Sequence, residues 1–320
     1  MTSRRRARGW LALALALGLL AGGCTVRVDD APPAIPAPDT TERVRQSAAQ
    51  DAEQLAELAT SARADLVIES DWGEVDSDLD HIAADAIEHL QALGGVWTPP
   101  PRPDDPTTDA ATTPASATPA DVYDELRSLT GAATTTATSD GVDGELATLL
   151  ASIAINRSLQ TEELRVDLRI ETSPPPLEGP PPLEGPPPLP EAFGPDAAAL
   201  CRALDSDGYV WEIVAARSDP DDRERAVARA EELRSQADEV AVTAGLAGTA
   251  QDPREATYDV DEADLAATAD RLDAELLPAW LAEFGAATAS DRERLLVLAT
   301  FAAFRAEDVD LRIATFPGLG

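Results

Sequence analysis

Two histidines and an acidic neighbour have the residue types and spacing of a possible metal site. His81, Asp85 and His89 follow one another at intervals of four residues, so in a helix they share one face. Imidazole and carboxylate groups bind divalent cations, but the two histidines would lie about 12 Å apart along the helix, too far for one metal ion. We therefore expect no bound metal or other cofactor, and these three residues are the ones that would supply metal ligands. A polar helix face and a pH-sensing pair are the alternatives.

Acidic residues on facing helices offer a second route to metal chemistry. Di-iron helical bundles use inward carboxylates together with Glu-x-x-His spacing. Neither histidine of this chain follows a glutamate by three positions. Carboxylates alone, or with His81 or His89, could still hold iron or manganese, and such a metalloprotein is the alternative function. Its acidic candidates are Asp205, Glu212, Glu275 and Glu307, whose ordinary position would be in solvent.

Aromatic residues in the second half of the chain could line a cavity for a small molecule. Tyr209, Trp211 and Trp280 lie in stretches with helical periodicity, and helical bundles hold ligands between their helices. The sequence contains neither the Gly-x-Ser-x-Gly pattern of a nucleophile elbow nor a glycine-rich phosphate loop. We therefore expect a binding protein and no enzyme activity.

The first 24 residues have the pattern of an export signal. Arg4, Arg5, Arg6 and Arg8 precede an apolar segment that ends at Leu20, and small residues follow it. The apolar segment is too short for a transmembrane helix. Leu20-Ala-Gly-Gly-Cys24 resembles a bacterial lipobox, which implies a signal peptide over residues 1–23 and a lipid on Cys24. An ordinary signal cleavage beside an unmodified cysteine is the alternative.

Composition restricts the partners and the compartment. The chain has 59 acidic and 25 basic residues and a formal charge of −34, which disfavours nucleic acid and electrostatic adsorption to anionic lipid. Lipid on Cys24 would therefore make the membrane attachment. The absence of lysine and the abundance of alanine resemble proteins of high-GC Gram-positive bacteria, so we expect the extracytoplasmic face of a cytoplasmic membrane. With Cys24 lipidated, Cys201 is left without a disulfide partner and is expected to be a small buried thiol on a helix.

Proline-rich and polar stretches divide the mature chain. Residues 24–40 are expected to form a disordered tether, and residues 172–192 repeat Pro-Pro-Pro-Leu-Glu-Gly and favour an extended polyproline linker. Between and after them, apolar periodicity predicts an N-terminal helical bundle over 41–171 and a second bundle over 193–320. No strand pattern is present, so the predicted fold class is all-α, with two four-helix bundles.

Turn and capping residues mark the predicted helices. Thr118 with Pro119, Asp219 with Pro220, and Ser290 are the predicted starts of three of them, and Glu293 would complete a capping box with Ser290. A run of Ala, Thr and Gly is expected to separate the third and fourth helices. The predicted helices are 42–66, 77–93, 120–129, 145–170, 196–217, 220–246, 261–284 and 290–311.

The second half resembles the DUF4439 family, which consists of uncharacterised actinobacterial ferritin-like domains. The resemblance is carried by Tyr209 with the closing Ala215-Ala-Arg217, the stretch from Leu276 to Leu281, and the terminal Thr315-Phe-Pro-Gly-Leu319. It implies an antiparallel four-helix bundle of ferritin type without an established activity. Many members of this family have a Glu-His pair ahead of the tyrosine, whereas this chain has Leu204 and Asp205 there, so a function that uses this pair does not carry over.

These observations predict a lipid-anchored envelope protein. We expect a non-catalytic binding or structural module with a degenerate ferritin-like domain. Its partners would be the membrane, through Cys24, and an envelope protein or a small molecule held between helices. The sequence predicts no binding to nucleic acid.

Overall fold

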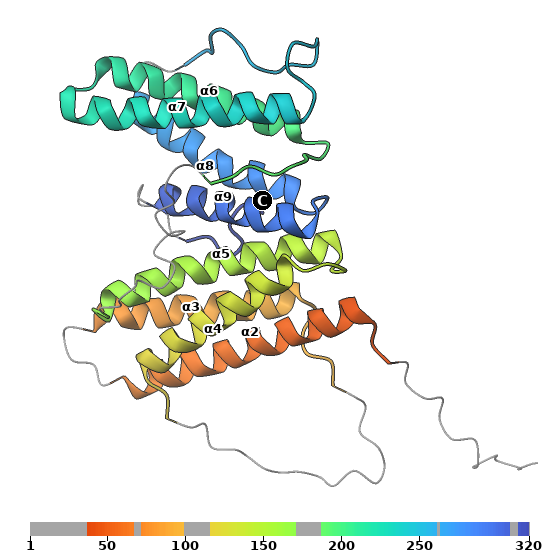
Figure 1. Ribbon diagram of the computed structural model, residues 1–320. Helices are drawn as coiled ribbons and strands as arrows, with labels where there is room; N and C mark the ends of the chain where they lie inside the picture. Colours follow the sequence, from red (N-terminus) through yellow and green to blue (C-terminus); the bar gives the residue numbers. More distant parts are fainter. Residues whose placement is uncertain are drawn as a thin grey trace, which may run out of the picture. The chain divides into compact units, whose positions relative to one another are not determined.

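The structure is a computed structural model that describes residues 37–66, 72–98, 116–170, 187–260, 263–307 and 313–319. Within these residues all regular secondary structure is α-helical, which confirms the all-α prediction. The predicted signal peptide, Cys24, most of the predicted tether and linker residues 172–186 lie outside the described residues. The helices are α2 (Thr40–Asp65), α3 (Gly73–Ala92), α4 (Pro119–Ala137), α5 (Gly144–Asp167), α6 (Ala197–Arg217), α7 (Pro220–Thr243), α8 (Leu265–Phe284) and α9 (Ala289–Glu307) (Figure 1).

Predicted capping residues begin two of these helices. At α4, the Thr118 side chain accepts a hydrogen bond from the Asp121 amide, and the Asp121 carboxylate accepts one from the Thr118 amide at 2.8 Å. Pro119 is the first residue of α4, where a helix needs no amide donor. At α7, Asp219 accepts from the Asp222 amide at 3.2 Å. These contacts satisfy amides that have no partner within the helix.

Helix α4 is longer than predicted. It continues past Leu129 to Ala137 through the run of Ala, Thr and Gly that was expected to end it. The Thr130 and Thr135 hydroxyls donate to carbonyl oxygens four residues earlier, at 2.7 and 2.8 Å, so both side chains are satisfied inside a helix. Packing along α5 then stabilises a segment of modest helix propensity.

Three other helix starts also differ from the prediction. Helix α8 begins at Leu265 rather than at Asp261, because the Asp264 side chain caps it by accepting from the Ala267 amide. Helix α3 begins at Gly73 rather than at Ser77 or Asp78, because Val75 is buried and extends its apolar face by one turn. Helix α9 begins at Ala289, and Thr288 is its capping residue.

The contacts around Thr288 show why the predicted cap was wrong. The Thr288 hydroxyl accepts from the Asp291 amide at 3.3 Å and donates to the Asp291 carboxylate at 3.0 Å. The predicted pairing of Ser290 with Glu293 is therefore two residues too late. Thr288 with Asp291 and Ser290 with Glu293 have the same capping spacing, so the sequence alone did not indicate which pair begins the helix.

The N-terminal helices, α2–α5, pack in pairs. Helix α2 lies along α3 and α4 lies along α5, with further contacts between α2 and α4 and between α3 and α5. Their shared core includes Leu55, Leu79, Ile82, Leu126 and Leu164, all buried. Burial of each such side chain contributes about 1.5–3 kcal/mol before entropic costs.

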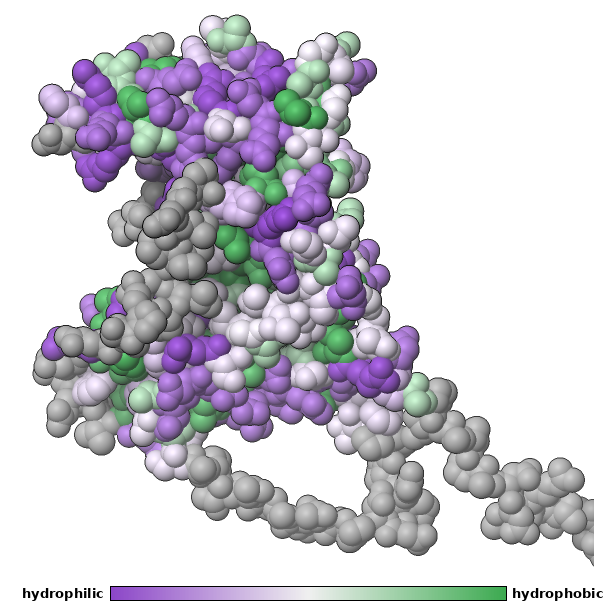
Figure 2. Space-filling view, in the orientation of Figure 1, coloured by the Kyte–Doolittle hydropathy of each residue, from purple (hydrophilic) through white to green (hydrophobic). Residues whose placement is uncertain are grey.

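The C-terminal helices, α6–α9, form three closely packed helix pairs. Helix α6 lies along α7 and contacts α8, and α8 lies along α9, whereas α7 and α9 are not closely packed. Their core includes Leu204, Leu233, Trp280, Phe284 and Leu295. In Figure 2 the surface over α6 and α7 is mostly hydrophilic. None of the described helices combines the length and apolar character needed to cross a membrane.

Helix α5 joins the two sets of helices. It contacts both α8 and α9, and its residues Leu150, Ile153 and Ile155 belong to the same continuous core as the C-terminal helices. Backbone atoms approach closely where α5 begins, because a Cβ on Gly144 would overlap the carbonyl oxygen of Gly285. The described residues from Asp39 onward therefore form one compact unit.

Candidate functional site

A cavity of about 680 Å³ opens on the side of the C-terminal helices where α7 and α9 do not pack closely. Trp280 and Phe301 form part of its apolar wall, and its charged residues include Arg229, Glu232 and Arg305. The volume lies within the range of about 300–1,000 Å³ that small-molecule sites occupy. Apolar walls with a few charged groups are typical of sites that hold and orient a ligand.

Charged side chains from all four C-terminal helices meet beside this cavity. Arg229 of α7 is paired with Glu232 of α7, at 3.1 Å between Nη1 and Oε2, and also with Asp273 of α8. Its Nη2 lies 3.9 Å from Oδ2 of Asp207 on α6. Arg305 of α9 reaches the same Glu232 at 3.2 Å. Arg229 is therefore shared among acidic residues of three helices.

Asp207 is the most deeply buried member of this charge cluster. Its side chain has 0 % exposure, and neither carboxyl oxygen has a hydrogen-bond partner among the described residues. Loss of water, with a further contribution from the charge of Asp273, raises the pKa of Asp207 to about 9, although Arg229 acts against the shift. Burial therefore favours the neutral, protonated form of the Asp207 carboxyl group.

The cluster differs in composition from a carboxylate metal centre. Asp207, Glu232 and Asp273 provide acidic groups, but the guanidinium of Arg229 lies among them as the counter-charge. In the part of the chain that the structure describes, no group of three or more His, Cys, Asp or Glu side chains is placed to hold a metal ion. The arrangement is a buried ion-pair network at the edge of a cavity.

No protein-family model matches this chain, and neither a curated protein nor a solved structure matches it.

The three aromatic residues predicted as pocket walls do not share one cavity. Trp280 lines the cavity described above. Tyr209 instead packs against Tyr258, with ring centroids 5.7 Å apart, and carries the guanidinium of Arg234 over its face. Trp211 is half-buried against the core, and its indole nitrogen has no hydrogen-bond partner among the described residues. Tyr209 and Trp211 are therefore not wall residues of this cavity.

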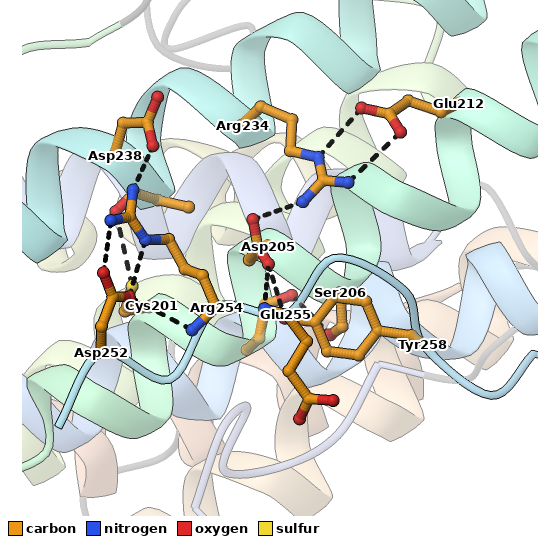
Figure 3. A network of polar contacts seen from close by, with 12 residues as sticks. Cys201, Asp205, Ser206, Glu212, Arg234, Asp238, Asp252, Arg254, Glu255 and Tyr258 are labelled. Atoms are coloured by element: carbon orange, nitrogen blue, oxygen red, sulfur yellow. Dashed lines mark hydrogen bonds and ion pairs between the residues drawn. The ribbon is translucent and has the colours of Figure 1, made fainter. Parts of the chain in front are cut away.

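Asp205 anchors the loop between α7 and α8 (Figure 3). Its Oδ2 accepts hydrogen bonds from the Tyr258 hydroxyl at 2.5 Å and from the Glu255 amide at 3.3 Å. Its Oδ1 pairs with Arg234, which also binds Glu212 at 3.0 Å. Asp205 is thus buried, as one of the acidic residues that the sequence suggested could point inward. Its contacts hold the loop between α7 and α8, and it does not line the cavity.

The thiol of Cys201 lies beside this network. Cys201 is buried on α6, as the sequence predicted, and its Sγ donates to the carbonyl oxygen of Ala237 at 3.4 Å. Burial raises the pKa of the thiol to about 11. A neutral, enclosed thiol is a packing group without nucleophilic character.

Asp85 holds the C-terminal segment, residues 313–319, against α5. Its Oδ1 accepts from the Thr315 hydroxyl at 2.7 Å. Its Oδ2 accepts from the side-chain amides of Asn156 at 2.9 Å and Gln160 at 2.8 Å. Hydrogen-bond donors therefore surround the carboxylate that was a candidate metal ligand.

His89 contacts the same segment. Its Nε2 donates to the carbonyl oxygen of Thr315 at 2.8 Å, and its ring meets Phe316 edge-on at 5.2 Å. Burial lowers the pKa of His89 to about 4, so the ring is neutral at pH 7. His81 is half-buried on the same helix. The structure does not bring these three residues together as a metal site.

Sequence reasoning missed the residues that form the charge cluster. Asp207 and Asp273 lie two residues from the proposed inward positions Asp205 and Glu275, and Glu212 and Glu275 are exposed. The side chain of Glu307 lies outside the described residues. Helical periodicity could have indicated one of these residues. Asp273 lies three residues before Leu276 and seven before Trp280, so it shares a helix face with these two buried residues.

Proposed function

We propose that this chain is a lipid-anchored, extracytoplasmic protein of a bacterial cell envelope that binds a ligand without converting it. The basic and apolar N-terminal segment, the lipobox-like residues before Cys24 and the strongly acidic composition support the location. The packing of α6 with α7 and α8, and of α8 with α9, supports a degenerate ferritin-like bundle of the DUF4439 type. Helices α2–α5 would form the other four-helix bundle.

The cavity between α7 and α9 carries the proposal for the ligand. Trp280 and Phe301 would contact an apolar body, such as an acyl chain or a ring. Arg305 has one ion pair in the described structure, to a Glu232 that also neutralises Arg229. Its other guanidinium donors would bind an anionic head group, so we propose an amphiphile with a carboxylate or phosphate end.

Dodecyl phosphate below its micelle concentration is a suitable probe of this cavity. Binding should change the tryptophan fluorescence of the full chain, and Trp280→Phe should remove most of that change. Arg305→Met should weaken binding about tenfold or more, since charge-assisted hydrogen bonds are lost. Arg271→Met is the matched control, because Arg271 is exposed on α8 and is paired with Glu275 outside the cavity. Equal affinities for the two variants would refute the assignment.

Native mass spectrometry on protein isolated from its own membranes tests the same proposal without a chosen probe. A metal-free protein that carries a defined extra mass would support a binding module and give the mass of the ligand. Stoichiometric iron or manganese in elemental analysis would instead support the metalloprotein alternative.

The anchor has a separate test in the two cysteines. Cys24→Ala should move the protein from the membrane fraction to the soluble fraction, because it removes the lipidated side chain. Cys201→Ala should stay with the membrane, since Cys201 is buried on α6. Continued membrane retention of Cys24→Ala would contradict lipid anchoring.

A further inference from the structure

A second cavity, of about 260 Å³, lies among the N-terminal helices and has a buried cation in its wall. The cation is Arg157 of α5, whose residue is 2 % exposed. This cavity shares no residue with the cavity between α7 and α9. The two cavities are therefore separate sites.

The guanidinium of Arg157 lacks the partners that a buried charge normally has. Its Nη1 reaches the carbonyl oxygen of Leu129 only at 3.5 Å, and its Nε has no hydrogen-bond partner among the described residues. No described carboxylate forms an ion pair with it. Buried charges are stable when they are paired and hydrogen-bonded, so Nε of Arg157 is left as a donor for a ligand.

Among acidic side chains, Asp51 has the largest effect on the pKa of Arg157, followed by Glu125, and Asp51 also lines the cavity. Asp51 is half-buried, and burial raises its pKa while Arg157 acts in the opposite direction. Burial lowers the pKa of Arg157 to about 10, which still leaves it charged at pH 7. A positive charge therefore faces the cavity with only partial compensation.

The cavity has an apolar floor and a polar mouth. Leu150 and Ile153 of α5 are buried in its wall, two turns and one turn before Arg157, respectively. Thr40 and Ser47 of α2 are exposed at its edge. A molecule entering from solvent would pass the exposed Arg43 and then meet apolar side chains and one buried cation, Arg157.

We propose that this cavity binds a small carboxylic acid with a short apolar tail. The carboxylate accepts two hydrogen bonds from the planar guanidinium of Arg157, and the tail packs on Leu150 and Ile153. The volume lies just below the range of about 300–1,000 Å³ for drug-sized ligands, which fits an acid about the size of octanoate. A monoanion suits the site, because Arg157 is buried in its wall and forms no ion pair with a carboxylate of the described residues.

Octanoate and octanol, titrated into the full chain by calorimetry, separate recognition of the carboxylate from recognition of the tail. Wild-type protein should bind octanoate at least tenfold more tightly than octanol. Arg157→Met should remove this preference and should fold, because it replaces an unpaired buried charge with an apolar chain of similar length. Arg127→Met is the matched control, since Arg127 is exposed on α4 and does not line the cavity.

Two further variants keep the proposal testable if Arg157→Met does not fold. Ala133→Leu should fill the cavity from α4 and abolish octanoate binding without changing any charge. Asp51→Asn should tighten octanoate binding several-fold by removing the competing carboxylate. The proposal is overturned if wild-type protein does not bind octanoate at millimolar concentration, or if Ala133→Leu or Arg157→Met binds it as tightly as Arg127→Met does.

Discussion

Asp207 shows how far burial can change an ordinary acidic residue. It has no exposed surface, its nearest cation is 3.9 Å away, and its oxygens have no hydrogen-bond partner among the described residues. A carboxyl group in such surroundings keeps its proton, because the charged form would lose its hydration without compensation. The acid then acts as a neutral neighbour of the pair between Arg229 and Asp273.

Stability should therefore depend on pH through Asp207. The folded pKa of about 9 lies above the ordinary value of 3.8, so between these values only the folded state holds the proton. Its contribution to stability is complete below about pH 3.8 and is lost as the pH rises toward 9. Asp207→Asn removes this dependence, so the variant should gain stability relative to wild type from pH 5 to pH 8.5, by up to about 1.4 kcal/mol per pH unit.

Thermal unfolding of both proteins at pH 5, 7 and 8.5 measures this difference. Asp124→Asn is the control, because Asp124 is exposed on α4. A constant difference between Asp207→Asn and wild type at all three values would show instead that Asp207 is ionised and paired with Arg229.

At the scale of elements, the C-terminal segment is held between α3 and α5 by polar contacts. Thr315 donates to Asp85, and its carbonyl oxygen accepts from His89, while the Ser152 hydroxyl donates to the carbonyl oxygen of Pro317 at 2.9 Å. On the other side, a Cβ on Gly318 would meet the side chains of Leu277 and Leu281. The segment therefore connects α3 and α5 to α8.

Acid should loosen this segment through His89. The folded pKa of about 4 lies below the ordinary value of 6.5, so protonation favours the unfolded state. The contribution of His89 is complete above about pH 6.5 and is lost as the pH falls to 4. His89→Gln keeps a donor toward Thr315 but does not titrate, so it should lose less stability than wild type over this range, by up to about 1.4 kcal/mol per pH unit.

His81→Gln is the matched control for this experiment, because His81 is half-buried on the same helix and does not contact the segment. Denaturant unfolding at pH 7 and pH 4.5 gives the required free energies. If His81→Gln and His89→Gln respond to acid alike, the role assigned to His89 is wrong.

At the scale of the molecule, the contact between α5 and the C-terminal helices depends on two glycines. Gly144 at the start of α5 lies against the backbone of Gly285 at the end of α8, and a Cβ there would overlap a carbonyl oxygen. Backbone atoms cannot move aside as a flexible side chain can. The approach of α5 to α8 and α9 therefore has little tolerance for larger residues.

Gly144→Ala should consequently destabilise the chain by about 1–3 kcal/mol, although alanine favours helices. Gly131→Ala is the opposite case, because Gly131 lies inside α4 with open space around its Cβ position. It should stabilise by up to about 1 kcal/mol. Urea unfolding of the two variants measures both effects, and a stabilised Gly144→Ala would show that the two glycines do not approach closely.

The fold class and many helix positions follow from local patterns in the sequence. Apolar periodicity and local caps, such as Thr118 with Asp121, act within a few residues and can be read without tertiary structure. The predicted burial of Cys201 followed from its small apolar neighbours on a helix. The end of α4 was harder to predict, because the Ala, Thr and Gly run is helical only through its packing on α5.

Which polar residues meet one another depends on how distant segments of the chain pack. Asp207, Arg229, Asp273 and Arg305 come from four helices, and no spacing in the sequence connects them. Asp85 and His89 have the spacing of metal ligands, yet they meet Thr315, about 230 residues later in the chain. Helical spacing fixes the face on which a side chain lies, but the element that packs on that face supplies its partner, and this choice depends on contacts between distant segments.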